Sequence, residues 1–190
     1  MQKIVLIIFG LAFAFSVSAK ESIRGHYQLV GSIPTAHSVS KVVFEEFMNF
    51  GCPHCNRLHK ASKDFRKKFA EKVEFIDIPI VFRGQDDSPL RLYYVARKIG
   101  KGKLIKDELF KASFIHGVNV FDPGITNYLA RSLGINKEYQ QEKDQAWVNK
   151  LIKEGERKSA IYGVTGTPTV VIQHSLKMDI SPYGTMSEFV

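Results

Sequence analysis

The sequence predicts an α/β domain in which a central mixed β-sheet is flanked by helices and carries a helical insertion. Short runs rich in β-branched and aromatic residues lie toward both ends of the chain, and a long helical region separates them. An amphipathic helix joins two of the earlier runs, a connection that favours neighbouring strands with a covering helix. The helical region, at about residues 87–162, is too long for a loop, so we expect an inserted subdomain.

Three strands and one helix are expected before the insertion. A short strand at 26–30 precedes a stronger strand at 41–49. A helix then runs to about Phe69, because residues at the spacing of one helical face are mostly apolar and the charged residues fall largely off that face. The face consists of Cys55, Leu58, Ser62, Phe65 and Phe69, and the charged residues are Arg57, Lys60, Lys63, Arg66 and Lys67. The third strand is expected at 73–82, with Pro79 at an edge, a bend or the strand end.

Glycines and prolines divide the rest of the chain into further elements. We expect helices at 90–99, 103–115, 125–133 and 137–160. Strands follow at 169–173 and 176–180, joined by a hairpin turn at His174 and Ser175. Residues 185–190 are all that remain for a closing helix, so either that helix is vestigial or the sheet face is covered in another way.

The first 19 residues predict a cleaved signal peptide. A basic head precedes an apolar stretch at 4–15, and the small residues that end at Ala19 fit a signal-peptidase site. The apolar stretch is shorter than the roughly 20 residues of a membrane span, which argues against an uncleaved anchor. We therefore expect a soluble, exported domain of residues 20–190, in a compartment where disulfides persist.

The charge pattern argues against nucleic-acid binding. The chain has a formal net charge of +8, but its acids and bases are interspersed, and no arginine-rich tract with interleaved aromatics occurs. A basic, solvated surface explains the charge more simply.

The two cysteines of the chain form the motif Cys52-Pro53-His54-Cys55, directly after the second strand. A bridge with two residues between its cysteines closes too small a loop to remove much chain entropy, so the pair is not a structural staple. Cys52 is expected at the open N-terminus of a helix, where unpaired N–H groups and the helix dipole stabilise a thiolate. Pro53 favours a helix start, and His54 can supply a proton or a positive charge beside the thiols. The motif predicts a redox-active pair.

The stability of the Cys52 thiolate determines how strongly the disulfide of the pair oxidises other thiols. A stabilised Cys52 thiolate favours the reduced form, which makes the disulfide a stronger oxidant. A substrate thiolate would attack Cys52, and a second substrate thiol would release the mixed disulfide. In a reductase, Cys55 would resolve it instead.

Two segments carry a resemblance to a known family. Residues 47–55 with the Cys-Pro-His-Cys dithiol, and residues 164–169 with the sequence Val-Thr-Gly-Thr-Pro-Thr, resemble the DsbA family of periplasmic thiol:disulfide oxidases. The resemblance implies a thioredoxin fold with a helical insertion and an enzyme that donates its disulfide to newly exported proteins. It also implies a periplasmic monomer without a cofactor beyond the Cys52–Cys55 disulfide, reoxidised by a quinone-linked membrane partner of the DsbB kind.

The same resemblance implies roles for single residues. Cys52 would be the nucleophile and Cys55 its buried partner, while Pro168 would be a cis-proline opposite the dithiol. Thr167 would offer backbone groups to an extended substrate segment. Glu46 would lie beneath the dithiol and either shuttle a proton to or from Cys55 or simply be a buried charge. The neighbouring Glu45 points to the other face of its strand and is expected to be solvated.

Thr167 departs from the family pattern and keeps alternatives open. The best-known oxidases carry valine there, whereas threonine is typical of reductase and isomerase relatives. A periplasmic reductase or isomerase is therefore the closest alternative, although too few residues precede the dithiol for an isomerase's dimerisation domain. A non-catalytic peptide-binding chaperone is the alternative from another class.

Metal and haem sites are the remaining candidates. Cys52, Cys55 and His59 could supply three ligands with His54 as a strained fourth, but a structural zinc site usually has four well-spaced ligands. We expect no metal and a solvated His59. Attachment of c-type haem needs histidine directly after the second cysteine, and that residue is Asn56. No role is assigned to His26, His37, His116 or His174, and Trp147 is expected in the core.

Overall fold

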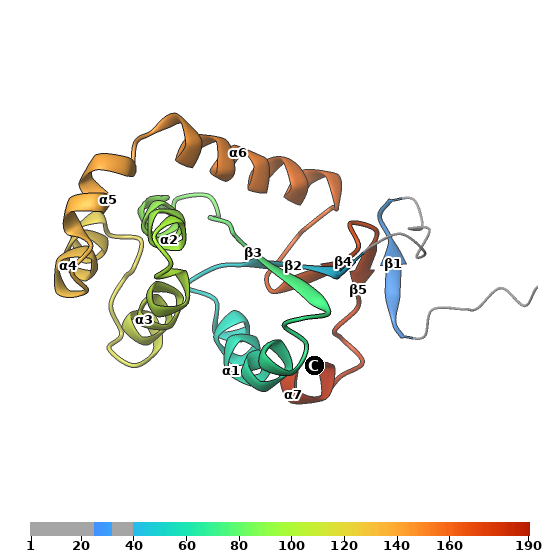
Figure 1. The fold of residues 1–190 in the computed structure, drawn as a ribbon. Helices are drawn as coiled ribbons and strands as arrows, with labels where there is room; N and C mark the ends of the chain where they lie inside the picture. The colour runs from blue at the N-terminus through green and yellow to red at the C-terminus, as the bar shows by residue number, and fades with distance from the viewer. Residues whose placement is uncertain (1–24, 32–39) are drawn as a thin grey trace, which may run out of the picture.

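The computed structural model describes residues 25–31 and 40–190, so the predicted signal peptide and its cleavage after Ala19 lie outside the described residues. Figure 1 shows the arrangement of the elements. In chain order they are β1 (Tyr27–Leu29), β2 (Val42–Met48), α1 (Pro53–Lys68), β3 (Val73–Pro79), α2 (Ser88–Lys98), α3 (Gly102–Phe114), α4 (Pro123–Ser132), α5 (Asn136–Glu142), α6 (Ala146–Ile161), β4 (Thr169–Ile172), β5 (Leu176–Met178) and α7 (Met186–Phe189).

The strands form one mixed sheet, as the sequence predicts. Their order is β1-β5-β4-β2-β3, with β2 and β3 parallel and the other neighbouring pairs antiparallel. The parallel pair is joined through α1, which is the connection expected for a strand, a helix and a strand in sequence. The register sets Glu46 opposite Asp77 and Phe47 opposite Thr169, so β2 lies between the acid of β3 and the start of β4.

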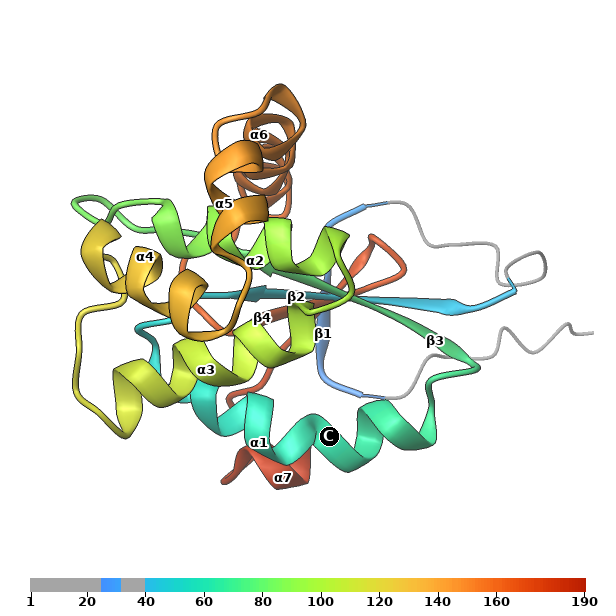
Figure 2. The ribbon, with the colours of Figure 1, turned by 60° about the vertical axis from the view of Figure 1, so that its left-hand side comes forward.

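Helices cover both faces of the sheet. In Figures 1 and 2, α1 and α7 lie against one face, α6 runs along the other, and α2 to α5 gather at one end of the sheet. The large apolar cluster joins Met48 and Phe50 at the end of β2 with Leu92 of α2 and Leu109 of α3, and it also contains Cys55. The expected insertion is therefore packed directly against the end of the sheet that carries the dithiol.

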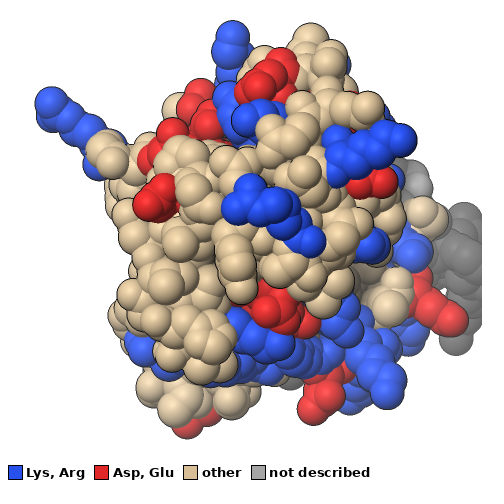
Figure 3. Space-filling view, turned by 90° about the vertical axis from the view of Figure 1, so that its left-hand side faces the viewer, with Lys and Arg blue, Asp and Glu red and all other residues tan. Residues whose placement is uncertain are grey.

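The surface of the insertion mixes both signs of charge. Figure 3, which views the molecule from the end where α2 to α5 gather, shows Lys and Arg beside Asp and Glu, with more Lys and Arg toward the α1 side. The interspersed charges in the sequence are thus also interspersed on this face.

Two element predictions are wrong in their extent. The helix expected at 137–160 is two helices, because Gln145 has extended backbone, with φ −69° and ψ 152°, and begins α6 separately from α5. The strand expected at 73–82 ends at Pro79, whose ring nitrogen has no N–H for the ladder. The other elements differ from the predictions by at most two residues at each end.

The chain ends in a single helical turn. Thr185 caps α7 with a capping box, in which its side chain accepts from the Glu188 N–H and the Glu188 side chain accepts from the Thr185 N–H. Met186 and Phe189 pack against the apolar cluster that includes Leu58 of α1. The short closing helix therefore covers part of α1.

Candidate functional site

Cys52 is the residue that begins α1. It is the N-cap, its Sγ accepts from the Cys55 backbone N–H at 3.4 Å, and Pro53 occupies the first turn, as expected from the motif. Both cysteines are free thiols, Cys52 partly exposed and Cys55 fully buried. A reaction partner can therefore approach only the first sulfur directly.

The two sulfurs have opposite acidities. Hydrogen bonds from Cys55, from Thr167 and from the backbone N–H groups of Cys55 and His54 lower the pKa of Cys52 to about 5, against the opposing effect of burial. The hydrogen bond to Cys52 and burial raise the pKa of Cys55, although the Asn49 N–H lies 3.5 Å from its sulfur. At neutral pH the thiolate is on Cys52, and Cys55 keeps its proton.

The loop before β4 completes the site. The Thr167–Pro168 peptide bond is cis, as the resemblance implies, and Pro168 is buried. The Thr167 carbonyl oxygen lies 3.1 Å from the Cys52 Sγ, so a loop distant in sequence lies directly against the dithiol. A strand-like segment bound to this loop would meet the Cys52 sulfur.

His54 contacts Cys52 through its backbone and Arg57 through its side chain. Its side chain is exposed, and its Nδ1 lies 2.8 Å from Nη2 of Arg57. Because a guanidinium can only donate, Nδ1 accepts and the imidazole of this pair is neutral, with its proton on Nε2. The backbone N–H of His54 is the group that bonds to Cys52. The cation beside the motif is therefore Arg57, which the sequence analysis placed on the charged side of the helix without a role.

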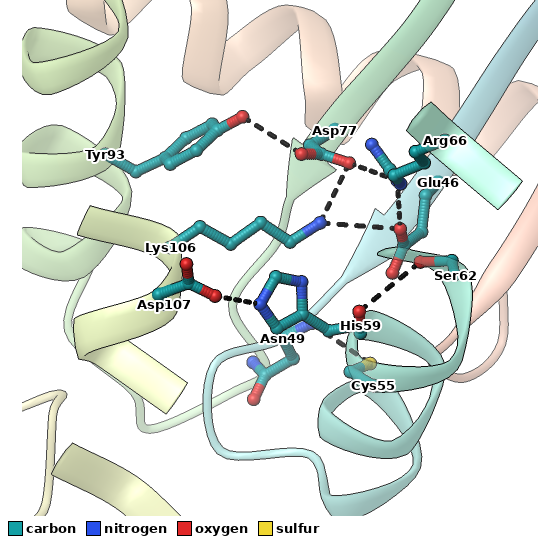
Figure 4. A network of polar contacts seen from close by, with 10 residues as sticks. All are labelled: Glu46, Asn49, Cys55, His59, Ser62, Arg66, Asp77, Tyr93, Lys106 and Asp107. Atoms are coloured by element: carbon teal, nitrogen blue, oxygen red, sulfur yellow. Dashed lines mark hydrogen bonds and ion pairs between the residues drawn. The ribbon is translucent and has the colours of Figure 1, made fainter. Parts of the chain in front are cut away.

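Glu46 lies in a buried ion cluster (Figure 4). Its Oε2 accepts from Arg66 at 2.6 Å and lies 3.5 Å from the Lys106 ammonium. The same two cations contact Asp77 at 2.7 and 2.9 Å, and the Tyr93 hydroxyl approaches Asp77 at 3.3 Å. Burial alone would raise the pKa of Asp77, but Lys106 and Arg66 lower it below its usual range. The negative charges of two carboxylates are thus neutralised by two cations within this buried cluster.

The cluster links the insertion to the sheet. Lys106 comes from α3, Arg66 from α1, and the carboxylates come from the neighbouring strands β2 and β3. Arg66 was predicted only as a charged residue off the apolar face of its helix, and no role was predicted for Lys106. An acid at Asp77 within an apolar strand was the available signal that buried cations had to lie nearby. The hydrogen bonds to Glu46 come from Arg66 and Lys106 and not from Cys55. Proton transfer between Glu46 and Cys55 therefore stays a prediction.

Two residues expected to be solvated are buried. Glu45 is fully buried because α6 and the β4–β5 turn cover its face of β2, and it accepts from Lys158 at 2.6 Å and His174 at 2.8 Å. His59 is 8% exposed, with Nε2 2.6 Å from Asp107 of α3 and its ring stacked on Phe110. Both predictions failed because the insertion and the later elements supply partners that lie far away in sequence.

Comparisons with known proteins identify the family. The family model described as thioredoxin matches residues 32–190. The chain belongs to the thioredoxin family. Among its relatives is the thiol:disulfide interchange protein DsbA of Pseudomonas syringae pv. tomato, 25% identical over 178 residues, which cover 93% of this chain and 82% of the relative. The protein of the same name from Escherichia coli is 27% identical over 194 residues, covering 97% and 88%.

Solved structures agree with the fold. DsbA of Pseudomonas aeruginosa aligns with a TM-score of 0.73 at 18% identity, covering 87% of this chain and 86% of that one. DsbA of Xylella fastidiosa aligns with a TM-score of 0.71 at 22% identity, covering 81% and 85%. The chain is a thiol:disulfide oxidoreductase of the DsbA family, with the thioredoxin fold and helical insertion expected from its sequence.

Two open cavities lie beside the dithiol of this DsbA-family protein. One, of about 730 Å³, lies between α1 and the segment after β5, and His54 of the motif lines it. The other, of about 600 Å³, is lined by Pro168 and Thr169. Both cavities include Ile180 and Ser181 in their walls, so they adjoin there, and the two together are called the groove.

Other site types find no support in the described ranges. Within residues 25–31 and 40–190, no group of three or more His, Cys, Asp and Glu side chains could hold a metal ion. Over the same ranges, no helix is long and apolar enough to cross a bilayer.

Proposed function

We propose that this protein donates the Cys52–Cys55 disulfide to thiols of newly exported proteins in the periplasm. The opposite acidities of the two sulfurs carry the proposal: the pKa of Cys52 is lowered to about 5, while that of Cys55 is raised. A stabilised Cys52 thiolate stabilises the reduced protein, and a stable reduced form makes the disulfide a strong oxidant. The reaction needs no cofactor beyond the disulfide itself.

The exchange proceeds in two balanced steps. A client thiolate attacks the Cys52 sulfur, a mixed disulfide forms, and Cys55 leaves as a thiolate that takes up a proton because its pKa is raised. A second client thiolate then attacks the client sulfur of the mixed disulfide, and Cys52 leaves as a stable thiolate. The client gains one disulfide and the protein gains two electrons. Thr167 and Pro168 would hold the client segment against Cys52 during both steps.

The compartment of the reaction and the partner that reoxidises the dithiol belong to the same proposal. The predicted signal peptide and the DsbA relatives support export to the periplasm. Action there as a monomer is part of the same proposal. Each turnover leaves a reduced dithiol, so an oxidant must restore the disulfide. A quinone-linked membrane partner of the DsbB kind would do so.

The redox potential of the mature protein tests the direction of transfer. The protein is equilibrated with a series of glutathione ratios, trapped with acid and alkylated, and the reduced fraction is measured. We expect a value near that known for DsbA itself, about −120 mV. A value near that of thioredoxin, about −270 mV, would instead make the protein a reductase.

A Cys52→Ser variant separates catalysis from chaperone action. The variant loses the attacking sulfur but keeps the groove, so oxidation of a reduced, unfolded client should stop. Suppression of client aggregation that persists in the variant, together with no oxidation by the wild type, would favour the chaperone alternative.

A further inference from the structure

One wall of the groove beside the dithiol is cationic. The cavity of about 730 Å³ is lined on the α1 side by His54, Arg57 and Lys60, which are three residues apart and therefore share a helix face. The opposite wall comes from the segment after β5 and the start of α7, where Ile180, Tyr183 and Met186 are half-buried. No Asp or Glu lines this cavity.

The two full charges of this wall have no acidic partner in the described part of the chain. Farther along α1, Lys63 pairs with Asp107 and Arg66 pairs with buried carboxylates, whereas no ion pair includes Arg57 or Lys60. Glu188 of α7 is engaged in capping its own helix. The wall therefore presents unneutralised positive charge to whatever enters the groove.

The guanidinium of Arg57 belongs to the first turns of the helix that Cys52 begins. Arg57 donates to Nδ1 of His54, which is the residue between the two cysteines of the motif, and the neutral imidazole leaves the guanidinium as the charged group. A client segment that moves toward Cys52 along α1 thus passes Lys60 and then Arg57, with Ile180, Tyr183 and Met186 on its other side.

We propose that Arg57 and Lys60 make the protein select client cysteines with Asp or Glu residues nearby in the sequence. This inference rests on the proposed function and specifies its substrate class. A carboxylate of the client would pair with Arg57 or Lys60, while an apolar side chain would contact Tyr183 and Met186. Exposed ion pairs are individually weak, so two of them favour an acidic over a basic client by about five- to tenfold, and added salt screens the effect.

Stopped-flow oxidation of matched peptides by the oxidised mature protein tests the inference. Three peptides share one cysteine sequence and differ only in two flanking residues, which are Asp, Ser or Lys. An acidic neighbour also raises the pKa of the peptide's own cysteine. Each rate is therefore divided by the rate of the same peptide with a small neutral disulfide.

Two double variants make the comparison specific. Arg57→Gln with Lys60→Gln removes the cationic wall, and Lys150→Gln with Lys153→Gln removes the same charge from exposed positions on α6, across the sheet (Figure 1). We expect the Asp peptide to react about five- to tenfold faster than the Lys peptide with the wild type and with the α6 control. The ratio should fall toward one in the groove variant and in about 0.5 M salt.

Equal corrected rates for the three peptides with the wild type at low salt would overturn the inference but leave the proposed function intact. A ratio that survives in the groove variant would likewise overturn it. Failure of the wild type to oxidise any peptide would overturn the proposed function, and the selectivity with it.

Discussion

The carbonyl oxygen of Thr167 lies 3.1 Å from the Sγ of Cys52, and 115 residues separate them in the chain. The side chain of the same threonine also lowers the pKa of both cysteines. One residue of the cis-proline loop thus supplies a backbone group beside the nucleophile and stabilises its thiolate. Thr167 therefore acts on the chemistry of the dithiol as well as lying where a client would bind.

Replacing Thr167 by valine should raise the pKa of Cys52 above about 5, because the thiolate loses one hydrogen-bond donor. The protein should become less oxidising in the same glutathione series. Absorbance of the thiolate at 240 nm, titrated against pH, measures the change. Thr165→Val, at an exposed position two residues earlier, serves as the control and should leave the titration where it is.

Replacing His54 by leucine should raise the pKa of Cys52 less than the change at Thr167 does. The hydrogen bond from position 54 comes from the backbone N–H, which leucine retains, while the imidazole contacts Arg57. The same 240 nm titration compares the two variants. A larger rise for His54→Leu would show that the imidazole itself, in its charged form, stabilises the thiolate.

The stability of the reduced protein should increase with pH relative to that of the oxidised protein. In the folded dithiol, Cys52 ionises from about pH 5, whereas an unfolded cysteine ionises near pH 8.5. The thiolate therefore stabilises the folded, reduced state increasingly between these values, and the stabilisation is lost as pH falls toward 5. Cys55 stays protonated in the folded protein because its pKa is raised, and its unfolded thiol ionises only near pH 8.5. It therefore adds little slope below about pH 7.5 and opposes the effect of Cys52 above that pH.

Thermal unfolding of both forms in matched buffers measures this difference. The midpoint of the reduced form minus that of the oxidised form should grow steadily from about pH 5 to about pH 7.5 and level off near pH 8.5. A difference that stays constant over this range would mean that Cys52 ionises near its ordinary pKa in the folded protein.

Local sequence signals predicted the positions of most elements and the chemistry of the dithiol. Cys52, Pro53 and Cys55 are placed by the helix they begin, and the pairing of a strand with a following amphipathic helix fixes where that helix lies. The cis-proline loop was found through its resemblance to a family motif, since nothing in its local pattern shows that it meets Cys52 across 115 residues.

The failures concern buried charges and have one physical cause. Glu45 and His59 are polar residues whose exposure depends on which elements cover them, and those elements lie far along the chain. Because side chains alternate along a strand, Glu45 was predicted to face solvent and Glu46 the core. Helices cover both faces of this sheet, so both acids are buried. Only the packing of α3 and α6 shows that Lys106 and Lys158 make such burial possible.

Replacing Lys106 by methionine should lower the free energy of unfolding by about 3–5 kcal/mol, because Glu46 and Asp77 would then share one cation in a buried site. Urea unfolding measures the change. Lys103→Met, on the exposed side of the same helix, should have little effect.

A second substitution tests whether charge balance is the cause. Adding Glu46→Gln to Lys106→Met restores one acid to one cation, so the double variant should be more stable than the Lys106→Met variant. If the losses of unfolding free energy caused by Glu46→Gln and by Lys106→Met simply add in the double variant, the two side chains contribute by packing alone.

Loss of Lys158 should lower the free energy of unfolding much more than loss of His174, although both residues pair with the buried Glu45. Lys158 is mostly buried and contacts it at 2.6 Å, so Lys158→Met would leave the buried carboxylate with the exposed His174 as its ion-pair partner, and we expect a loss of about 3 kcal/mol or more. The His174 side chain is 51% exposed, so its ion pair should contribute less than about 1 kcal/mol. The variant used is His174→Asn, because the residue has φ 57° and asparagine tolerates that conformation better than alanine. Urea unfolding of both variants at the same pH decides between the partners, and equal losses would mean that the exposed histidine balances the buried charge as well as lysine does.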